Sequence, residues 1–185
     1  MNKTRNMILV AFFIALTAIG AKIEIPLPFV PITLQVLFVF MAGILLGKKL
    51  GALSQLLYVA MGLIGLPVFA KGGGLGYVFK PSFGYLIGFI LAAYVIGLIV
   101  ENRELNFKQA FWASIVGLLV IYACGVPYLY YILNNIMGVN ITPYGAVKAG
   151  MLTFLPGDII KILVVASLTP QIHKRIKPFI ENKRM

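Results

Sequence analysis

The sequence predicts an all-α integral membrane protein with six transmembrane helices and both termini in the cytoplasm. Three observations lead to this prediction: an apolar composition, six apolar stretches, and the placement of lysine and arginine. Of 185 residues, 61% are apolar and 11% are charged, and the mean hydropathy is +0.97. Ordinary soluble domains are roughly 45–50% apolar and about 25% charged. A soluble domain of this size leaves about a third of its chain's surface exposed, so it could not hide this composition.

Six apolar stretches are separated by charges or by turns rich in proline and glycine. About 20 apolar residues, rising about 1.5 Å each, cross a hydrocarbon core about 30 Å thick. The predicted helices are residues 7–23, 32–47, 50–70, 82–100, 110–133 and 151–170. Together they form a single domain over residues 1–185.

Local signals mark the limits of these helices in order. Lys3 and Arg5 precede the first, which lacks a small-residue cleavage site, so we expect a retained helix rather than a signal peptide. The second follows the proline-rich segment 26–31 and ends before two lysines. The third stops before a glycine-rich loop, the fourth lies between Pro81 and Glu101, and the fifth gives way to asparagines. The sixth contains an internal Pro-Gly pair.

Orientation follows from the basic residues, because short cytoplasmic loops are enriched in them. With the N-terminus inside, four fall outside (Lys22, Lys71, Lys80, Lys148) and Lys161 lies within a helix. The other eleven are cytoplasmic: Lys3, Arg5, Lys48, Lys49, Arg103, Lys108, Lys174, Arg175, Lys177, Lys183 and Arg184. The basic tail from Lys174 to Arg184 is best interpreted as a topology signal in contact with anionic lipid.

Three irregular segments are assigned to the outer side, at residues 25–31, 71–81 and 134–150. Irregular backbone at a membrane needs protein or a water-lined cavity to satisfy its polar groups. The segments therefore predict a covered pocket that opens outward. Its position would suit a ligand that arrives from outside the cell.

The strongest local signal is an acid and a base inside the sixth apolar stretch. Asp158 is the only aspartate in the chain, and Lys161 follows it by three residues on the same helical face. A charge near the bilayer centre costs roughly 2.5–3.5 kcal/mol, so such a pair is a candidate site. Pro156 and Gly157 would interrupt the helix and place Asp158 near a new N-terminus, which favours a carboxylate. The alternative is a mutually neutralised structural ion pair.

Other candidate ligand contacts surround the predicted pocket. Thr33 and Gln35 are polar groups just inside the second stretch and need hydrogen bonds there; they suit helix packing as well as a ligand. The run from Gly72 to Gly76, with Gly73 and Gly74, precedes Tyr77 and Tyr85. These tyrosines offer apolar faces with hydroxyl groups, although an interfacial aromatic belt uses the same residue type.

Several function classes are disfavoured. The single Cys124 gives neither a disulfide nor a Cys/His metal cluster, and no soluble basic face suits nucleic acid. Neither glycine-rich run has the spacing of a phosphate-binding loop, so we expect no ATPase site and no cofactor. An intramembrane enzyme would need a second catalytic group beside Asp158 and Lys161. A small-residue stripe on the first helix, with Ala11 and Ala15, predicts a partner-facing surface.

Five motifs follow one another along nearly the whole chain. They are Pro28-Phe-Val-Pro31-Ile-Thr-Leu-Gln35, Ala42-Gly-Ile-Leu-Leu-Gly47, Gly62-Leu-Ile-Gly-Leu-Pro67-Val-Phe, Gly72-Gly-Gly-Leu-Gly76 with Pro81-Ser-Phe-Gly84-Tyr85, and Pro156-Gly-Asp158-Ile-Ile-Lys161. In this order the chain resembles the biotin-specific S components of energy-coupling-factor (ECF) transporters, the BioY family. Lys80 departs from that pattern, in which a small residue is expected before Pro81.

The resemblance implies a six-helix S-component bundle in the plasma membrane that captures biotin outside the cell. The implied substrate-binding residues are Asp158, Lys161, Gln35, Thr33, Gly73, Gly74, Tyr77 and Tyr85. Such a protein carries no energy source and docks, through Ala11 and Ala15, on a T component coupled to two ABC-type ATPases. A stand-alone small-molecule carrier or channel is the alternative, since the residues alone do not establish a partner.

Overall fold

The computed structural model describes the backbone of residues 3–101 and 103–181 and the side chains as far as Arg175. Its regular structure is helical apart from one two-stranded antiparallel hairpin, in which Glu24 pairs with Thr33 and Ile25 with Ile32. The elements in order are α1 (Lys3–Lys22), β1 (Glu24–Ile25), β2 (Ile32–Thr33), α2 (Gln35–Leu63), the 3₁₀ helix η1 (Leu75–Phe79), α3 (Phe83–Val100), α4 (Phe107–Asn135), α5 (Pro143–Val147), the π-helix η2 (Lys148–Leu152) and α6 (Leu155–Glu181).

Five helical segments in the described residues are long and apolar enough to cross a membrane. They are Lys3–Lys22, Gln35–Leu63, Phe83–Val100, Phe107–Asn135 and Pro143–Arg175. The last joins α5, η2 and α6. This agrees with the predicted all-α membrane class, and the helices differ from the predicted stretches by a few residues at most ends.

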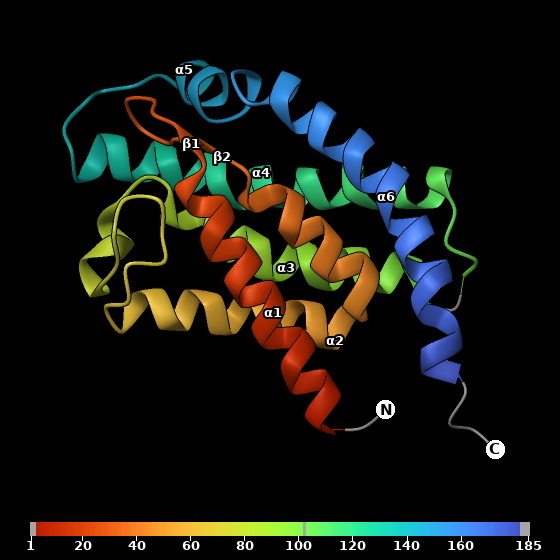
Figure 1. The fold of residues 1–185 in the computed structure, drawn as a ribbon. Coiled ribbons are helices and arrows are strands. Elements are labelled where there is room, and N and C mark those ends of the chain that lie inside the picture. Colours follow the sequence, from red (N-terminus) through yellow and green to blue (C-terminus); the bar gives the residue numbers. More distant parts are fainter. Residues whose placement is uncertain (1–2, 102, 182–185) are drawn as a thin grey trace.

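Helix α2 is not straight: it folds back on itself at Gly47, whose φ of 76° and ψ of 178° are not helical. Gln35 Nε2 lies 2.8 Å from the Tyr58 hydroxyl, although 23 residues of straight helix would separate them by about 35 Å. A side chain at Gly51 would lie 2.9 Å from the Ala42 carbonyl oxygen. Figure 1 shows the two legs of α2 running in different directions. They correspond to the predicted stretches 32–47 and 50–70.

The second leg ends at Leu63, and the prediction that it continues to residue 70 was wrong. Gly65 has a φ of 109°, which leaves the helical region, and Pro67 has no backbone N–H for a further helical bond. Residues 64–74 instead form a loop that is closed by a hydrogen bond from Gly74 N to Gly62 O, at 2.7 Å. This loop brings Phe69 and Ala70 over the end of the bundle.

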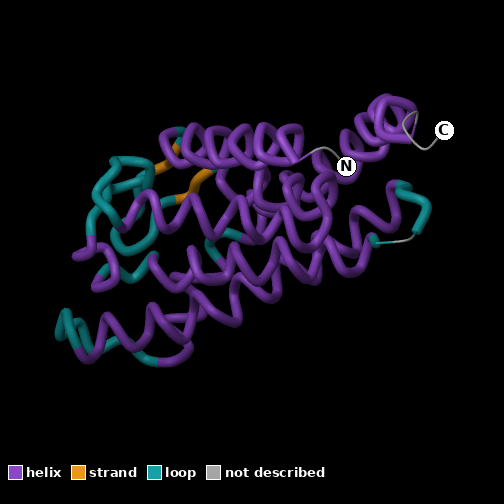
Figure 2. The backbone as a smooth tube through the Cα atoms, turned by 90° about the horizontal axis from the view of Figure 1, so that it is seen from below, coloured by secondary structure: helices purple, strands orange, loops and turns teal. Residues whose placement is uncertain are grey.

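The helices form one bundle in which α3 packs between α2 and α4, α1 packs on α2, and α6 packs on α4 and α2. Close contact of α3 with α4 depends on small residues: a side chain at Gly88 would lie 2.9 Å from Ile121 Cα. Loops 23–34, 64–82 and 136–142 gather at one end, and the two chain termini lie toward the other (Figure 1). Figure 2 shows the same separation, with most loops and the hairpin at one end.

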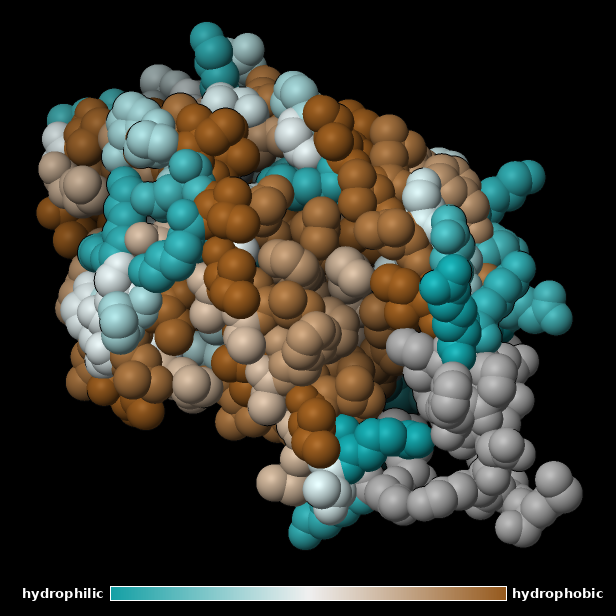
Figure 3. Space-filling model, viewed as in Figure 1, coloured by the Kyte–Doolittle hydropathy of each residue, from teal (hydrophilic) through white to brown (hydrophobic). Residues whose placement is uncertain are grey.

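The outer surface of the bundle is apolar between two polar ends. Figure 3 shows apolar residues over the middle of one face and polar residues at its margins. Large exposed side chains include Phe12, Leu98, Trp112, Leu119 and Ile160. A soluble monomer does not expose such continuous apolar area, whereas helices that face lipid do. Of the predicted basic tail, Lys174 and Arg175 are exposed; the side chains of Lys177, Lys183 and Arg184 lie outside the described residues.

Candidate ligand-binding site

The candidate site begins at the first turn of α6, which places Asp158 at the end of the bundle that carries the loops. Helix α6 starts at Leu155, and Pro156 falls in its first turn, where a missing N–H costs nothing. The preceding π-helix η2 ends at Leu152, and Asp158 N donates to Phe154 O at 2.9 Å. The predicted restart of the helix just before Asp158 is thus observed.

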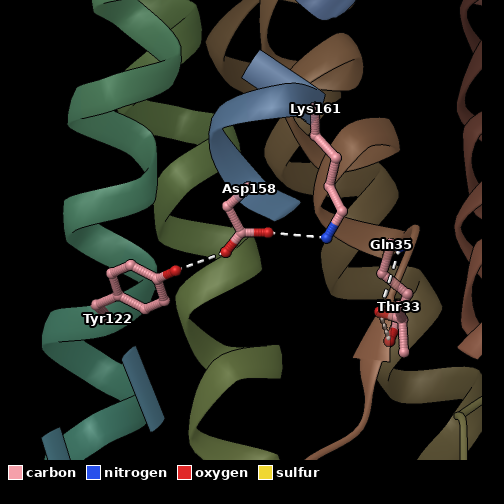
Figure 4. Close-up of polar contacts among 5 residues, drawn as sticks. All are labelled: Thr33, Gln35, Tyr122, Asp158 and Lys161. Atoms are coloured by element: carbon pink, nitrogen blue, oxygen red, sulfur yellow. Dashed lines mark hydrogen bonds and ion pairs between the residues drawn. The ribbon is translucent and has the colours of Figure 1, made fainter. Parts of the chain in front are cut away.

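Asp158 and Lys161 form a buried ion pair that receives a third partner from α4. Lys161 Nζ lies 2.8 Å from Asp158 Oδ1, and the Tyr122 hydroxyl donates to Asp158 Oδ2 at 2.6 Å. Asp158 is 3% exposed and Lys161 is 6% exposed. Figure 4 shows the carboxylate between the tyrosine and the ammonium group. Both oxygens of the only aspartate are therefore held in place before any ligand arrives.

Thr33 and Gln35 form a second polar group, at the junction of β2 with α2 (Figure 4). The Thr33 hydroxyl donates to Gln35 Oε1 at 3.0 Å, and the Gln35 amide nitrogen donates to the Tyr58 hydroxyl at 2.8 Å. Tyr58 in turn donates to the Val68 carbonyl at 2.9 Å. This relay ties both legs of α2 to the loop above them, which is a packing role; a ligand role for Thr33 and Gln35 stays a prediction.

A partly enclosed hollow of about 550 Å³, counting its opening, connects the two polar groups. Six of the eight predicted substrate-binding residues line it: Asp158, Lys161, Gln35, Thr33, Tyr77 and Tyr85. The other lining residues are mostly apolar or aromatic: Val30, Pro31, Val36, Ala70, Ser82, Leu86, Phe89, Ile121, Tyr122 and Phe154.

Gly73 and Gly74 are not among the residues that line the hollow, and the contacts described for them are within the loop itself. A side chain at Gly73 would lie 2.2 Å from the Leu66 carbonyl oxygen. Gly74 has a φ of 99°, and its N–H closes the loop on Gly62. The backbone of the glycine run shapes the loop that carries Ala70 and Tyr77 to the hollow.

The two predicted tyrosines hold the wall of the hollow through their hydroxyl groups. Tyr85 donates to the Gly150 carbonyl in η2 at 2.7 Å, and Tyr77 accepts a 3.2 Å hydrogen bond from the Ser82 hydroxyl. Burial raises the pKa of the Tyr77 hydroxyl, which therefore stays protonated at neutral pH. Lys80, the departure noted in the sequence, donates to the Lys71 carbonyl at 2.8 Å and lies 4.7 Å from the centre of the Tyr77 ring.

Sequence reasoning missed Tyr122, Phe89 and Phe154. Tyr122 is surrounded by apolar residues in the middle of a long helix, and nothing in its neighbours marks it as different from a lipid-facing tyrosine. One signal was present in the sequence. Some residues of the fifth apolar stretch had to pack against the sixth, and the buried Asp158 carboxylate of the sixth needs a hydrogen-bond donor. Sequence spacing alone does not select Tyr122 from the other tyrosines of the same helix.

The hydrogen-bonding groups left open around the hollow define its chemistry. Lys161 has three N–H donors and uses one on Asp158. Each Asp158 oxygen accepts one described bond and has a lone pair left for another. The hollow therefore presents a charged donor and a charged acceptor side by side, among apolar and aromatic walls. It suits a mainly apolar molecule with a polar end that both donates and accepts.

The proposed partner-facing residues lie apart from this hollow. Ala11 and Ala15 are exposed on α1, whereas Val10, Phe13 and Thr17 of the same helix are buried. The exposed stripe thus points away from the bundle. Neither alanine is among the lining residues of the hollow.

Lipid-facing helices that enclose a polar-ended hollow define a membrane protein that binds a small molecule. Comparison with known proteins identifies the group: the chain belongs to the BioY family, whose sequence model matches residues 1–178. It is a multi-pass protein of the cell membrane.

Individual relatives agree with this assignment. The chain is 46% identical over 174 residues to a probable biotin transporter BioY of Lysinibacillus sphaericus, covering 94% of this chain and 89% of the relative. It is 42% identical over 171 residues to the biotin transporter BioY of Thermotoga maritima, covering 92% and 96%. Its fold is similar to the 2.1 Å crystal structure of the S-component for biotin from an ECF-type ABC transporter. The TM-score of that match is 0.82, at 28% identity over 94% of this chain and 95% of the other.

Proposed function

We propose that this protein is the biotin-binding S component of an ECF-type vitamin uptake transporter, which captures biotin with high affinity outside the cell. The observation that carries the proposal is that the buried Asp158–Lys161 pair lines the hollow of a BioY-family chain. A pair kept only for stability gains little over apolar residues of the same size, because burying two charges is costly. A ligand that uses both charges accounts for the pair.

The ring end of biotin fits the charged pair better than its carboxylate does. The cyclic urea has two N–H donors beside one carbonyl, so it can donate to Asp158 and accept from Lys161 at the same time. Charge-assisted bonds of this kind are roughly twice as strong as neutral ones. The biotin carboxylate at the same place would pair with Lys161, but its negative charge would be repelled by the Asp158 oxygens. The second arrangement, with Lys161 on the valerate carboxylate, is the alternative.

We also propose six membrane crossings with both termini in the cytoplasm. The two legs of α2, which separate at Gly47, would each cross, and this turns five spanning segments into six. Eleven basic residues then fall inside, as the positive-inside rule requires. The same orientation turns the loop-rich end and its hollow toward the outside.

Partners follow from the proposed role. An S component has no energy source of its own, so it would deliver biotin through a T component and two ABC-type ATPases. The exposed Ala11 and Ala15 on α1 are the proposed contact, because small residues allow a partner helix to approach closely. No resident cofactor is proposed, since biotin is the transported ligand.

Calorimetric titration of the purified full chain in detergent tests the proposal. We expect saturable binding of biotin at one site per chain, with thiamin and riboflavin giving no heat of binding. Uptake into sealed vesicles then separates the S component from a stand-alone carrier. Biotin accumulation should require the T component and ATP, and ATP-independent accumulation by the chain alone would favour the carrier.

A further inference from the structure

A second concave surface lies at the opposite end of the bundle from the ligand-binding hollow. It is a shallow, open groove at the connection between α3 and α4, of about 810 Å³ when the solvent space at its open side is included. Figure 1 shows this connection toward the end where the chain termini lie. We call it the α3–α4 groove, and it is lined by Ile99, Arg103, Glu104, Asn106, Lys108, Gln109 and Trp112.

Two cations of the groove have no acidic partner among the side chains that the structure describes. The ion pairs among the described side chains are Lys48–Glu101 and Lys161–Asp158, and neither includes Arg103 or Lys108. Glu101 lies two residues before Arg103, but its carboxylate is already 2.6 Å from the Lys48 ammonium. Glu104 also lines the groove. With two cations and one carboxylate, the groove carries a net charge of +1.

An aromatic group adjoins these charges on the first turns of α4. Trp112 lines the groove and is 64% exposed. Phe107 stacks on Phe111 at 6.1 Å between ring centres, and Phe111 contacts Trp112 edge to face at 5.6 Å. Exposed aromatic rings next to cations are typical of the headgroup level of a bilayer, where the ring is half in hydrocarbon and half in water.

From this charge and this aromatic edge we infer that the α3–α4 groove binds the headgroup of an anionic phospholipid that carries one net negative charge. The phosphate would contact Arg103, whose guanidinium can bind two oxygens at once, and Lys108. Glu104 would accept a hydrogen bond from a headgroup hydroxyl. Trp112 would lie along the upper acyl chain. The occupant is a bilayer lipid because exposed apolar side chains, Val116 and Leu119, follow Trp112 along α4.

The chain offers a direct probe, because Trp112 is its only tryptophan. The full-length protein is reconstituted in mixed vesicles of phosphatidylcholine and phosphatidylglycerol, with bromine atoms near the carbonyl end of one lipid or the other. Bromine quenches tryptophan fluorescence at short range, so the relative quenching reports which lipid occupies the groove. Each Lys or Arg near an anionic surface contributes about fivefold to lipid affinity.

For the wild-type chain we expect about a fivefold preference of Trp112 for phosphatidylglycerol. Arg103→Gln or Lys108→Gln should each abolish that preference, whereas Glu104→Gln should raise it to about 25-fold, since it removes the opposing charge. Lys71→Gln makes the same change of charge at the other end of the bundle and should have no effect. Unchanged biotin binding by each variant would show that it is folded.

Equal quenching by the two lipids in the wild-type chain would overturn the inference. So would a preference that Lys71→Gln lowers as much as Lys108→Gln does, because net charge rather than the groove would then be responsible. Soluble glycerol phosphate should not reverse the quenching; if it does, the groove binds a soluble phosphate compound and not a lipid.

Discussion

The Tyr122 hydroxyl donates a 2.6 Å hydrogen bond to Asp158 Oδ2 and so connects the middle of α4 to the first turn of α6. The opposite oxygen of the same carboxylate is held by Lys161 at 2.8 Å. With both oxygens fixed, the carboxylate plane has little freedom to turn. A ligand that donates to Asp158 therefore meets an oriented acceptor, which reduces the ordering cost of binding.

The first prediction concerns this bond. Tyr122→Phe removes only the hydroxyl, and we expect biotin affinity to fall about 2- to 13-fold, because the freed carboxylate must then be ordered on binding, at about 0.5–1.5 kcal/mol for one side chain. Calorimetric titration measures the change. Tyr131→Phe is the matched control. Tyr131 lies on the same helix and is exposed, so the Tyr131→Phe protein should bind biotin with wild-type affinity. A Tyr122→Phe protein with wild-type affinity would leave the tyrosine a purely structural role.

Asp158→Asn tests the acid itself. The amide keeps the shape, but it loses the charge that attracts an N–H donor and leaves Lys161 buried without its counter-charge. We expect biotin affinity to fall about 10- to 100-fold, in line with the loss of a charge-assisted bond of about 1.5–3 kcal/mol. Glu101→Gln makes the same chemical change in the exposed Lys48–Glu101 pair, far from the hollow, and should leave affinity unchanged. Unaltered binding by Asp158→Asn would show that the ion pair is structural.

These two variants also mark how far the sequence could predict the site. Asp158 and Lys161 were found because charge inside an apolar stretch is costly and therefore conspicuous. Thr33 and Gln35 were found because polar groups just inside an apolar stretch need hydrogen bonds, and Tyr77 and Tyr85 were found as aromatic residues with hydroxyl groups beside the glycine run. Tyr122 has neither signal, and its contact with Asp158 spans 36 residues, so only the packing of α4 on α6 brings the two together. Whether the eight predicted residues bind biotin stays a prediction.

The fold shows the same division between local and distant information. Composition and apolar stretches predicted the helical membrane class, because both depend on neighbouring residues. The fold-back of α2 was also indicated, since Gly47 and two lysines break the apolar run there. The early end of α2 at Leu63 was missed. The prediction followed the run of apolar residues through 64–70 and gave no weight to Gly65 and Pro67, which disfavour a helix. Within residues 64–70, Phe69 is the side chain that packs into the bundle end, whereas Ile64 and Leu66 are exposed.

The third prediction separates the packing role of the glycine run from a ligand role. Gly73→Ala would place a methyl group 2.2 Å from the Leu66 carbonyl oxygen. Gly74→Ala would force a side chain into a backbone conformation, φ 99° and ψ 163°, that is essentially restricted to glycine and costs roughly 1–3 kcal/mol. Both should lower the midpoint of thermal unfolding without biotin. Gly76→Ala is the matched control: nothing lies within 4 Å of its added methyl group, so it should unfold like the wild type. Equal midpoints for all three variants would contradict the packing role.

The last prediction concerns the exposed face of α1. Ala11→Leu or Ala15→Leu adds bulk to a surface that the bundle does not use, so biotin binding and thermal stability should match the wild type. If a partner helix approaches these alanines, the added side chains would hold it away, since small residues are what permit close contact in a membrane. We therefore expect ATP-dependent biotin uptake, measured in vesicles that contain the T component and ATPases, to fall at least severalfold for either variant. Ala123→Leu places the same bulk on an exposed position of α4 and should leave uptake intact.

Uptake that is insensitive to both α1 variants would place the partner contact on another face. A fall in biotin binding itself would instead mean that α1 supports the hollow, through the chain that leads from Lys22 to Thr33.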